Sequence, residues 1–384
     1  MTFRVLHVTT AHRPHDPRIV YKQCPTLAAD YEVWCAIPDA DPQVATNVQF
    51  IRLPYYERVI WRILITCPLI LWRCWRLRPD LVHFYVPEFI PFAFLFRLRG
   101  ARLIYEVQEN LFKKLHLKTK NRGWLLKKAF TLLDQLARRY CYCIFTEHGY
   151  LSTYTNLRKP SVVIYNYASL PLLDPFRKPY LPQQQPATFF YIGWLSMERA
   201  VDTLLAAFAR LRANHIDFFV HLFGRQTFSQ ETLDANADYQ QVRTQLHFYG
   251  YADQRLALQY AEGAVAGLAL LKPIGDYPES YTTKLFEYMA LGLPVITADF
   301  PLYKDVVERH QCGFCVDPYN ADAVAKALTY LIVNPDEAEQ MGNRGREAVI
   351  RHYNWTTEAV KLLAFYKQVL HTPQHHPAVE QTSL

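Results

Sequence analysis

Residues 278–296 read PESYTTKLFEYMALGLPVI, and this stretch carries the strongest fold signal in the chain. Glu279 and Glu287 stand eight positions apart, with a hydroxyl-rich helix start between them. Thr282 or Thr283 can cap this helix, because a side-chain hydroxyl accepts a hydrogen bond from a free N–H group of the first turn. A Gly-x-Pro sequence ends the helix, and the apolar run after it indicates a buried strand. The stretch therefore predicts a loop, a helix and a strand, as in the repeating unit of a parallel α/β sheet.

The start of this helix is a candidate anion site. Its first backbone N–H groups have no partner within the helix, and the helix dipole favours negative charge there. A ligand lying across the helix start could meet Glu279, then the amides of Tyr281, Thr282 and Thr283, and then Glu287. A nucleoside diphosphate sugar fits this order, because it presents sugar hydroxyls, a diphosphate and ribose hydroxyls. The alternative is an ordinary helix with Glu287 and its neighbouring lysine paired on the surface.

The stretch resembles the E-x7-E signature of retaining GT-B glycosyltransferases of the family 4 type. By this resemblance, Glu279 faces the donor sugar and Glu287 holds the ribose. Lys284 and Arg199 would stabilise the leaving diphosphate. Arg199 ends the segment from Gly193 onwards, GWLSMER, which resembles the G-x-L-x-x-x-R segment of that family. Arginine suits phosphate because its planar fork donates directed, charge-assisted hydrogen bonds. The alternative for Arg199 is a solvated side chain near a helix start.

Two further turns follow predicted strands of the second half. Gly224-Arg225 and Gly250-Tyr251 each end such a strand, and ligands of open α/β sheets bind at the carboxyl ends of strands. The resemblance places Gly224, Arg225 and Tyr251 near the base and ribose of the donor. Plain turns, for which glycine is well suited, are the alternative.

The first half carries a polar loop directly after its first strand. Residues 9–18 read TTAHRPHDPR and resemble the H-x-x-x-D-x-R segment of many relatives. His12, Asp16 and Arg18 are therefore candidates for the cleft, where they could touch either acceptor or donor phosphate. The alternative is a capped helix start with Asp16 as the cap.

A second polar loop follows the strand predicted at 103–107. Relatives often read Y-x-x-H-[DE] here, with the histidine near the donor sugar, whereas this chain has Gln108 followed by Glu109. Glutamine can donate a hydrogen bond but cannot accept a proton. We therefore expect Gln108 and Glu109 to line the cleft without supplying a general base at position 108.

Strand-like and helix-like segments alternate along the whole chain. Strands are predicted at 3–8, 32–37, 48–53, 81–86, 103–107, 143–146, 162–165, 188–192, 218–223, 245–249, 265–270 and 295–297. Helices are predicted at 18–29, 125–140, 201–213, 254–262, 321–333, 335–353 and 355–370. The alternation is typical of doubly wound parallel sheets. The fold class is therefore α/β, and the resemblance makes it GT-B, with two Rossmann-like domains facing a cleft.

The expected division of the chain follows its composition. A stretch rich in proline and glutamine separates two series of alternating elements and indicates a linker. We expect an acceptor-side domain at 1–170, the linker at 171–186, a nucleotide-sugar-binding domain at 187–353, a helix crossing back to the first domain at 354–370, and a loose tail at 371–384.

The charge of the chain is distributed unevenly. The net charge of +7 combines 24 Lys and Arg against 12 Asp and Glu in residues 1–170 with 18 against 23 in the remainder. Such asymmetry suggests that the first half meets an anionic partner, such as an anionic membrane, a phosphorylated lipid or nucleic acid. The resemblance to a glycosyltransferase favours the membrane or lipid, and we expect no nucleic acid partner.

One basic segment of the first half is a candidate membrane surface. Residues 57–78 mix five arginines with three tryptophans and many Ile and Leu, and their uncharged run is too short to span a bilayer. Basic residues and Trp on an apolar body suit a helix lying in the membrane interface, kinked at Pro68. Residues 89–96 and the Lys-rich segment 113–128 could extend this surface. The alternative is a helix that covers the sheet, with snorkelling arginines.

Other motifs give no metal or redox site. Asp39-Ala40-Asp41 matches the D-x-D of another glycosyltransferase fold, but before Pro42 it indicates a surface turn. Cys312-Gly-Phe-Cys315 has no second pair nearby and indicates packing beside a strand. Scattered cysteines in apolar runs, and an N-terminal run too short for a secretory signal, indicate a reduced, cytoplasmic chain. We expect no metal and no cofactor, and peripheral binding to the inner membrane face.

Together these features predict a retaining glycosyltransferase. It would move a hexosyl-type sugar from a UDP or GDP donor to a saccharide or lipid-linked acceptor, in cell-surface polysaccharide or glycolipid synthesis. No enzymic nucleophile is evident, so the leaving diphosphate would itself take the acceptor's proton. A GT-B nucleotide-sugar epimerase and a catalytically silent GT-B partner subunit remain as alternatives.

Overall fold

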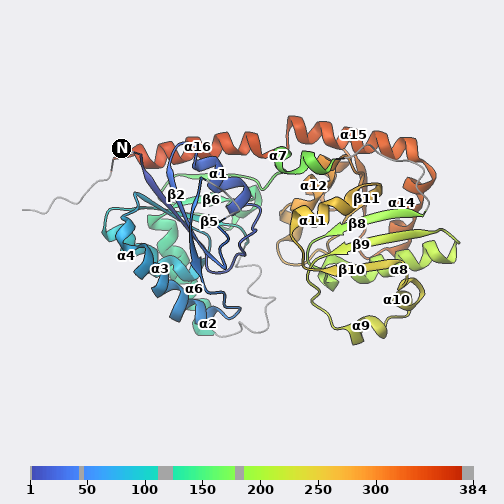
Figure 1. Cartoon of the computed structure of the whole chain (residues 1–384), viewed down its shortest axis with the longest axis horizontal. Coiled ribbons are helices and arrows are strands. Elements are labelled where there is room, and N and C mark those ends of the chain that lie inside the picture. The colour runs from blue at the N-terminus through green and yellow to red at the C-terminus, as the bar shows by residue number, and fades with distance from the viewer. Residues whose placement is uncertain (1, 43–46, 111–123, 178–185, 374–384) are drawn as a thin grey trace, which may run out of the picture.

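The computed structural model describes residues 2–42, 47–110, 124–177 and 186–373. Two α/β domains lie side by side along the long axis, each built around one sheet (Figure 1). Part of the expected linker and tail, and most of the Lys-rich segment 113–128, lie outside the described residues.

The N-terminal domain is built on a parallel sheet of seven strands in the order β3-β2-β1-β4-β5-β6-β7. The strands are β1 (Arg4–Val8), β2 (Glu32–Pro38), β3 (Gln49–Leu53), β4 (Leu81–Phe84), β5 (Arg102–Val107), β6 (Tyr142–Phe145) and β7 (Ser161–Val163). The central strands are apolar along nearly their whole length because helices cover both faces of the sheet. Every residue of β4 and β6 is accordingly buried.

Short helical segments surround this sheet. They are η1 (Ile19–Gln23), α1 (Cys24–Leu27), α2 (Val59–Trp61), η2 (Arg62–Thr66), α3 (Cys67–Cys74), η3 (Trp75–Leu77), η4 (Pro87–Phe89), α4 (Ile90–Leu98), α6 (Trp124–Tyr140) and η6 (His148–Ser152). Two of them, η1 and η2, are π-helical turns, and each runs into a helix with a proline in its first turn. Proline has no N–H group to donate, so it interrupts the regular hydrogen bonding of an α-helix. The wider turn η2 accommodates this interruption just before Pro68, where the sequence predicted a kink.

The C-terminal domain repeats the design with a parallel sheet of six strands in the order β10-β9-β8-β11-β12-β13. The strands are β8 (Ala187–Ile192), β9 (Phe218–Phe223), β10 (Leu246–Gly250), β11 (Ala264–Ala269), β12 (Val295–Ala298) and β13 (Gly313–Val316). The helices are η8 (Met197–Arg199), α8 (Val201–Ala213), α9 (Gln230–Asp234), α10 (Ala237–Val242), α11 (Gln254–Leu258), η9 (Gln259–Ala261), η10 (Tyr277–Glu279), α12 (Thr283–Leu291), α13 (Pro301–Val307), α14 (Ala321–Val333) and α15 (Pro335–Arg351).

Most predicted elements are present within a few residues of their expected bounds, and the differences have physical causes. Strand β13 was missed because it is an edge strand of only four residues, too short for its apolar run to stand out in the sequence. It contains Cys315, while Cys312 lies just before it, and both thiols are free. The helix predicted at 18–29 is divided into η1 and α1 and ends at Leu27.

The last helix, α16 (Trp355–His371), crosses back and packs on the N-terminal domain, while α15 lies on the C-terminal domain (Figure 1). Asn354 begins α16, and its side chain accepts the Thr357 N–H at 3.2 Å. The backbone N–H of Trp355 donates to the Ala168 carbonyl at 2.7 Å, which ties the crossover to the segment joining the domains. The buried face of α16 includes Leu362, in the same apolar cluster as β1 and β2.

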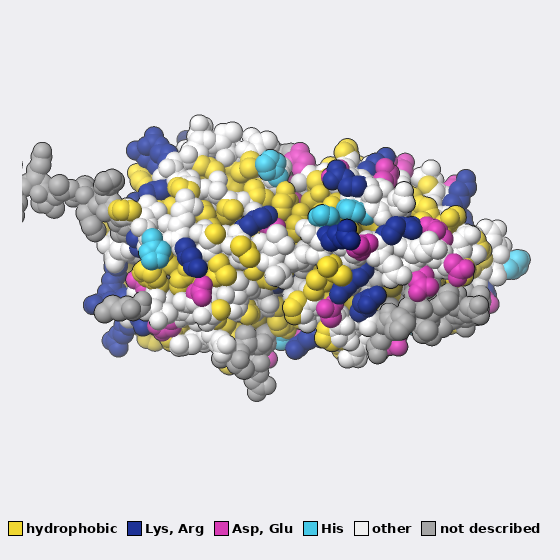
Figure 2. All heavy atoms as spheres, turned by 90° about the horizontal axis from the view of Figure 1, so that it is seen from above, with side chains coloured by type: hydrophobic (Ala, Val, Ile, Leu, Met, Phe, Trp, Pro, Cys, Tyr) yellow, Lys and Arg dark blue, Asp and Glu magenta, His cyan; other side chains and the backbone are white. Residues whose placement is uncertain are grey.

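Seen from the side of α15 and α16, acidic side chains gather mainly over the C-terminal domain (Figure 2). This distribution follows the charge asymmetry of the sequence. Among the described helices, none is both long enough and apolar enough to cross a membrane.

Each sheet has a point where strand order reverses, between β1 and β4 in the first and between β8 and β11 in the second. The loops leaving two such neighbouring strands diverge, so the carboxyl edge opens there into a crevice that can receive a ligand. Gly193 follows β8, and Glu279 follows β11. The fold therefore brings together at one edge residues that lie 86 positions apart in the sequence.

Leu362→Ala should destabilise the N-terminal domain by about 2–5 kcal/mol, because it removes a fully buried side chain and leaves a cavity. Urea unfolding followed by the intrinsic Trp fluorescence would measure the change. Val360→Ala, on the exposed side of the same helix, should stay within about 0.5 kcal/mol of the parent protein. Equal effects of the two substitutions would mean that α16 does not contribute to the core.

Candidate functional site

The floor of the candidate site is formed where β8 and β9 end. Gly193 has φ +135° and Gly224 has φ +142°, backbone conformations that glycine adopts without strain. A Cβ atom built on Gly224 would lie 1.7 Å from the Gly193 carbonyl oxygen, so no other residue fits there. The Gly193 N–H donates to the Phe223 carbonyl at 2.8 Å, which joins the two turns. The close approach of the two turns is therefore the reason why position 224 needs glycine.

Two cations converge on the open side of Gly193. A Cβ atom built there would lie 3.5 Å from Nη1 of Arg199 and 3.6 Å from Nζ of Lys284. Arg199 ends the short helix η8, and Lys284 lies in the first turn of α12. The space that a side chain would fill at position 193 is thus bordered by two positive charges. Such a cradle suits a phosphate group, because cations and a helix N-terminus meet there.

The Lys284 ammonium is buried without a counter-ion. Its side chain is 3% exposed, and among the described residues Nζ has no hydrogen-bond partner. The Nζ atom lies 3.7 Å from the centre of the Tyr191 ring, which supplies a cation–π contact. Burial, assisted by the charge of Arg199, holds the pKa of Lys284 well below its ordinary value, and Glu287 opposes this shift. An anion bound at Gly193 would relieve the cost of this burial.

Glu287 lies one turn further along α12 and is also buried. Its Oε1 atom accepts a hydrogen bond from Gln254 Nε2 of α11 at 2.8 Å. Burial raises the pKa of Glu287, while the charges of Lys22 and Lys284 and the bond from Gln254 act in the opposite direction. The carboxyl group is thus held in place within reach of a ligand that crosses the start of α12.

Lys22 is the part of this arrangement that comes from the N-terminal domain. Its Nζ atom donates to Asn166 Oδ1 at 2.8 Å and to the Tyr167 carbonyl at 2.7 Å, in the segment that joins the domains. Burial lowers the pKa of Lys22 to about 8, and Glu287 opposes the shift. Lys22 therefore connects the joining segment electrostatically with Glu287.

Glu279 ends η10, the turn between β11 and α12, and it is half-buried. The same loop holds Asp276, which is 1% exposed and accepts hydrogen bonds from the N-terminal domain. Glu279 and Glu287 thus lie on either side of the first turn of α12, as the spacing of the two glutamates predicted.

The first amides of α12 differ from the expectation. Thr282 occupies the N-cap position, but its side chain makes no capping hydrogen bond. The Thr282 N–H instead donates to the Tyr303 hydroxyl at 3.1 Å, and the Tyr281 N–H donates to the Glu147 carboxyl. Two of the three amides predicted to receive an anion are therefore engaged by protein groups. The cations, rather than these two amides, are the main anion-binding feature of the structure.

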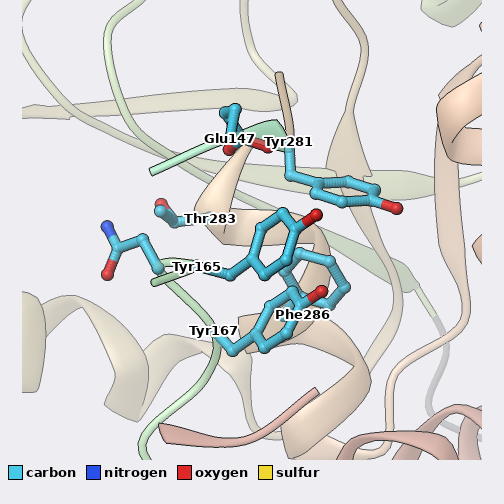
Figure 3. A pocket seen from close by; sticks show the side chains of 7 residues that line it. Glu147, Tyr165, Tyr167, Tyr281, Thr283 and Phe286 are labelled. Carbon is cyan, nitrogen blue, oxygen red and sulfur yellow. The ribbon is translucent and has the colours of Figure 1, made fainter. Parts of the chain in front are cut away.

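A narrow pocket lies beside this helix start, between the two domains (Figure 3). The centre of a water-sized molecule can occupy about 10 Å³ of it, close to the room that one water needs. The Tyr165 and Tyr167 rings stack at 4.9 Å, and the Tyr281 ring lies next to them. Glu147 borders the pocket near Tyr281, and its burial raises the pKa of its carboxyl well above the ordinary value. The residues lining the pocket are Glu147, Tyr165, Asn166, Tyr167, Tyr281, Thr283 and Phe286.

In the first-half loop, Asp16 and Arg18 make contacts within the N-terminal domain. Asp16 Oδ1 accepts the backbone N–H groups of Arg18 and Ile19 at 3.0 and 2.9 Å, which is the capping alternative that the sequence left open. Arg18 is buried, and its Nε donates to Glu106 at 2.8 Å. A contact of Asp16 or Arg18 with acceptor or donor stays a prediction.

His12 and Gln108 lie together, as expected for two loops at the carboxyl ends of strands in one sheet. His12 Nε2 and Gln108 Oε1 are 2.9 Å apart, and Gln108 Nε2 donates to Glu106 at 2.8 Å. Glu109, the next residue, is exposed. Gln108 thus occupies a hydrogen-bonded position beside the cleft loop, and its part in catalysis stays a prediction.

The two exposed candidates of the C-terminal domain face the other domain. Tyr251 is largely exposed. Partial loss of solvent around its hydroxyl raises its pKa, and the nearby charge of Arg13 opposes this shift. Arg225 lies 3.8 Å from Glu57 and 5.8 Å from the Trp194 ring. Both residues therefore border the space between the domains, and their contact with the base and ribose of a donor stays a prediction.

Sequence reasoning missed four residues of this site: Lys22, Glu147, Gln254 and Asp276. Glu147 follows β6 directly, and Asp276 lies in the loop after β11, so the rule that ligands bind at the carboxyl ends of strands could have found both. Lys22 and Gln254 lie on helices and carry no comparable signal in the sequence.

The D-x-D segment at Asp39 lies in a turn, and the C-x-x-C segment leads into the edge strand β13 with both thiols free. Asp39 has φ +52°, and its carboxylate lies 3.5 Å from Arg13 Nη1, which is consistent with a surface turn. Across the described ranges, no group of three or more His, Cys, Asp or Glu side chains is arranged to hold a metal ion.

Comparison with known proteins relates both the sequence and the fold to glycosyltransferases. Residues 174–348 match the family model described as glycosyl transferases group 1. Glycogen synthase of Mycobacterium tuberculosis is 24% identical over 197 residues, which are 50% of this chain and 46% of that protein. The chain therefore matches about half the length of this relative. The range matched by the family model, residues 174–348, contains Glu279 and Glu287.

Two solved structures resemble the whole chain. Sucrose-phosphate synthase from Thermosynechococcus elongatus superposes with a TM-score of 0.74 at 18% identity, covering 96% of this chain and 99% of that one. Anabaena Alr3699/HepE in complex with UDP-glucose gives 0.69 at 14% identity, covering 95% and 99%. The predicted GT-B fold is thereby confirmed.

Lys284→Met should make the ligand-free protein more stable by roughly 1–3 kcal/mol, because it removes a buried and unpaired ammonium while keeping the apolar stem. The same substitution should weaken the binding of a nucleoside diphosphate. Thermal unfolding with and without UDP or GDP would measure both effects. Lys326→Met, at an exposed position of α14, should change neither. A less stable Lys284→Met protein would show that the ammonium is compensated in the free state.

Proposed function

We propose that this chain is a GT-B glycosyltransferase that transfers a sugar from a nucleoside diphosphate donor with retention of configuration. The main support is the pair of cations, Arg199 and Lys284, that border an open space at Gly193, where Lys284 Nζ has no hydrogen-bond partner among the described residues. The family match over residues 174–348 and the GT-B fold agree with this proposal. The complex of Anabaena Alr3699/HepE with UDP-glucose supports a donor of this class.

In the proposed complex the diphosphate lies at Gly193, between Arg199 and Lys284. The ribose hydroxyls reach Glu287, whose carboxyl is held by Gln254. The sugar lies on the other side of the start of α12, at Glu279. Each group of the donor then has a partner of suitable chemistry, and all of these partners belong to the C-terminal domain.

The reaction follows from charge stabilisation and positioning. As the bond between sugar and diphosphate breaks, negative charge grows on the leaving oxygen, and Arg199 and Lys284 are already placed to stabilise it. The leaving phosphate oxygen, on the same face as the incoming hydroxyl, takes the acceptor's proton as the new bond forms. Glu279 orients the sugar, and we propose that no metal ion takes part.

The acceptor is proposed to be a saccharide or a lipid-linked saccharide, met at a membrane surface by the N-terminal domain. Segments η2 and α3 bury Thr66, Cys67, Ile70 and Cys74 on the sheet and expose the opposite side. On that side Leu64 is 58% and Trp72 75% exposed. One side of the helix covers the sheet, as in the alternative interpretation of the sequence. The other side presents exposed apolar side chains, which supports the proposal of a helix lying in the membrane interface.

Exposed basic residues lie on or beside the same helical segments as exposed apolar side chains. We call the whole surface the Arg/Trp face. Its apolar members are Ile60, Trp61, Leu64, Ile65, Trp72, Trp75, Leu95, Leu98, Leu132 and Leu136, and its basic members are Arg58, Arg73, Arg76, Arg78, Arg97, Arg99, Lys128 and Arg139. The nearby acids Asp80 and Glu88 already accept bonds from Arg4 and Thr10. Exposed apolar and basic side chains on the same helical segments fit an anionic membrane.

Glu279→Gln and Glu287→Ala should distinguish the role of Glu279 at the sugar from the role of Glu287 at the ribose. Glu287→Ala should weaken UDP or GDP binding by about 1.5–3 kcal/mol, since it removes an acceptor that is charged when it binds hydroxyls. Glu279→Gln should leave the affinity for the bare nucleotide within about twofold but lower the turnover of the intact donor more than tenfold. Calorimetry and a donor-turnover assay with UDP and GDP sugars would measure these changes.

Glu339→Ala, on an exposed part of α15, is the matched control and should change neither quantity. Product analysis separates transfer from epimerisation, and a protein that turns over no donor would favour the silent-subunit alternative. Activity lost in EDTA and restored by Mn²⁺ or Mg²⁺ would contradict the metal-free mechanism. Unchanged nucleotide affinity of Glu287→Ala would contradict the ribose assignment.

The N-terminal domain should bind anionic vesicles and release them as the salt concentration rises. Replacing Arg73, Arg76 and Arg78 together by Gln should weaken this binding by about 3 kcal/mol, because each basic residue near an anionic surface contributes about 1 kcal/mol. Vesicle flotation with anionic and neutral lipids would measure the effect.

The matched control removes the same charge from exposed positions of the C-terminal domain, by replacing Arg243, Arg309 and Arg351 with Gln. It should leave vesicle binding nearly unchanged, and neither triple variant should change the affinity for UDP. Equal losses in the two triple variants would show that net charge, rather than the Arg/Trp face, drives the binding.

A further inference from the structure

The loop that carries Glu279 is anchored on the opposite domain. The Asp276 side chain is buried, and its Oδ2 atom accepts the Asn110 backbone N–H at 3.1 Å and the Tyr150 hydroxyl at 3.0 Å. Asn110 follows β5, and Tyr150 lies in η6, so both donors belong to the N-terminal domain. Burial and the Asp276 charge raise the pKa of Tyr150, so the hydroxyl keeps the proton that it donates.

Asp276 is connected to Glu279 through its own backbone. Its carbonyl oxygen accepts the Glu279 N–H at 3.0 Å and the Ser280 hydroxyl at 3.0 Å. The side chain of Asp276 thus accepts hydrogen bonds from the N-terminal domain, while its backbone carbonyl accepts the N–H of Glu279. A shift of Asp276 would be passed to Glu279 through this one short turn.

Two further contacts hold the loop on either side of Asp276 and Glu279. A Cβ atom built on Gly149 would lie 3.1 Å from the Glu279 carbonyl oxygen and 3.3 Å from its Cβ, so the two backbones are in close contact. The Glu147 carboxyl accepts the Tyr281 N–H, two residues beyond Glu279. The N-terminal domain therefore touches the loop at positions 276, 279 and 281.

We propose that Asp276 is a positioning residue for the transfer reaction: by binding Asn110 and Tyr150 it sets Glu279 in place only when the two domains meet. This inference rests on the proposed function and adds to it that the N-terminal domain completes the sugar end of the donor site. The Asp276 anchor does not reach the nucleotide end, because Arg199, Lys284 and Glu287 belong to other segments of the C-terminal domain. Disturbing the anchor should therefore lower kcat while the affinity for nucleotide stays the same.

A pair of tyrosine substitutions tests this inference. Tyr150→Phe removes only the hydroxyl that binds Asp276. Tyr21→Phe removes a hydroxyl of the same domain that lies 3.0 Å from His15 Nδ1, away from the Glu279 loop. Tyr150→Phe should lower kcat about tenfold or more with the UDP affinity unchanged, because small displacements of reacting groups cost up to roughly 100-fold. Tyr21→Phe should leave both quantities within about twofold of the parent enzyme. Equal losses of kcat in the two variants would overturn the specific role of Asp276.

Substitutions at Asp276 separate a positioning role from a chemical one. Asp276→Asn keeps an acceptor oxygen and should retain most of the activity, whereas Asp276→Ala should lose about 100-fold in kcat. Gly149→Ala, which pushes on Glu279 from the other domain, should also lower kcat without weakening UDP binding. If Asp276→Asn is as inactive as Asp276→Ala, the carboxylate acts by its charge and the positioning role is overturned.

Hydrogen exchange provides a readout that does not depend on turnover. Asp276→Ala should speed the exchange of the amides at 276–281 in the presence of UDP, with the amides of β12 unchanged. If the parent protein turns over no donor, the proposed function fails while a local change in exchange still supports the anchor. If the parent enzyme is active and Asp276→Ala changes neither kcat nor exchange, the anchor is refuted and the proposed function stands.

Discussion

A buried ammonium without a counter-ion, Lys284, is the constraint around which the C-terminal site is arranged. Placing a cation in the interior is unfavourable unless an anion or hydrogen bonds compensate it. Within residues 2–42, 47–110, 124–177 and 186–373, the groups that act favourably on this charge are the face of Tyr191 and the carboxyl of Glu287. The first turn of α12 therefore holds the Lys284 charge, which a bound anion can balance better than the protein does. The ligand-free protein is less stable for this burial, at the place where an anion is expected to bind.

The geometry around Lys284 depends on how closely strands β8 and β9 approach at their ends. Gly193 and Gly224 pack backbone against backbone, which leaves an open space over Gly193 that Arg199 and Lys284 border. Any side chain at Gly224 would separate the two turns, and a side chain at Gly193 would fill the space. The cation pair and the glycine pair thus form one feature, although they come from the connection between β8 and α8, the turn after β9 and the helix α12.

The two domains are unequal partners in this arrangement. The C-terminal domain holds the cations and both glutamates, whereas the N-terminal domain supplies contacts that place them. Lys22 lies near Glu287, and Tyr150 and Asn110 hold the loop of Glu279. The helix α16 and the joining segment tie the domains on the side away from the Arg/Trp face (Figure 1). Contact between the domains therefore reaches the sugar end of the site more directly than its nucleotide end.

The sequence by itself determined the fold class, nearly all strands and the main site helix, because apolar runs and helix ends are local signals. The spacing of Glu279 and Glu287 was enough to place them on either side of a helix start. Only the tertiary structure decided which polar groups are available to a ligand. The amides of Tyr281 and Thr282 look free in the sequence, but Glu147 and Tyr303 reach them from distant segments. Lys22 and Asp276 likewise acquire their roles from residues more than 100 positions away, since burial and partnership depend on packing that no local pattern records.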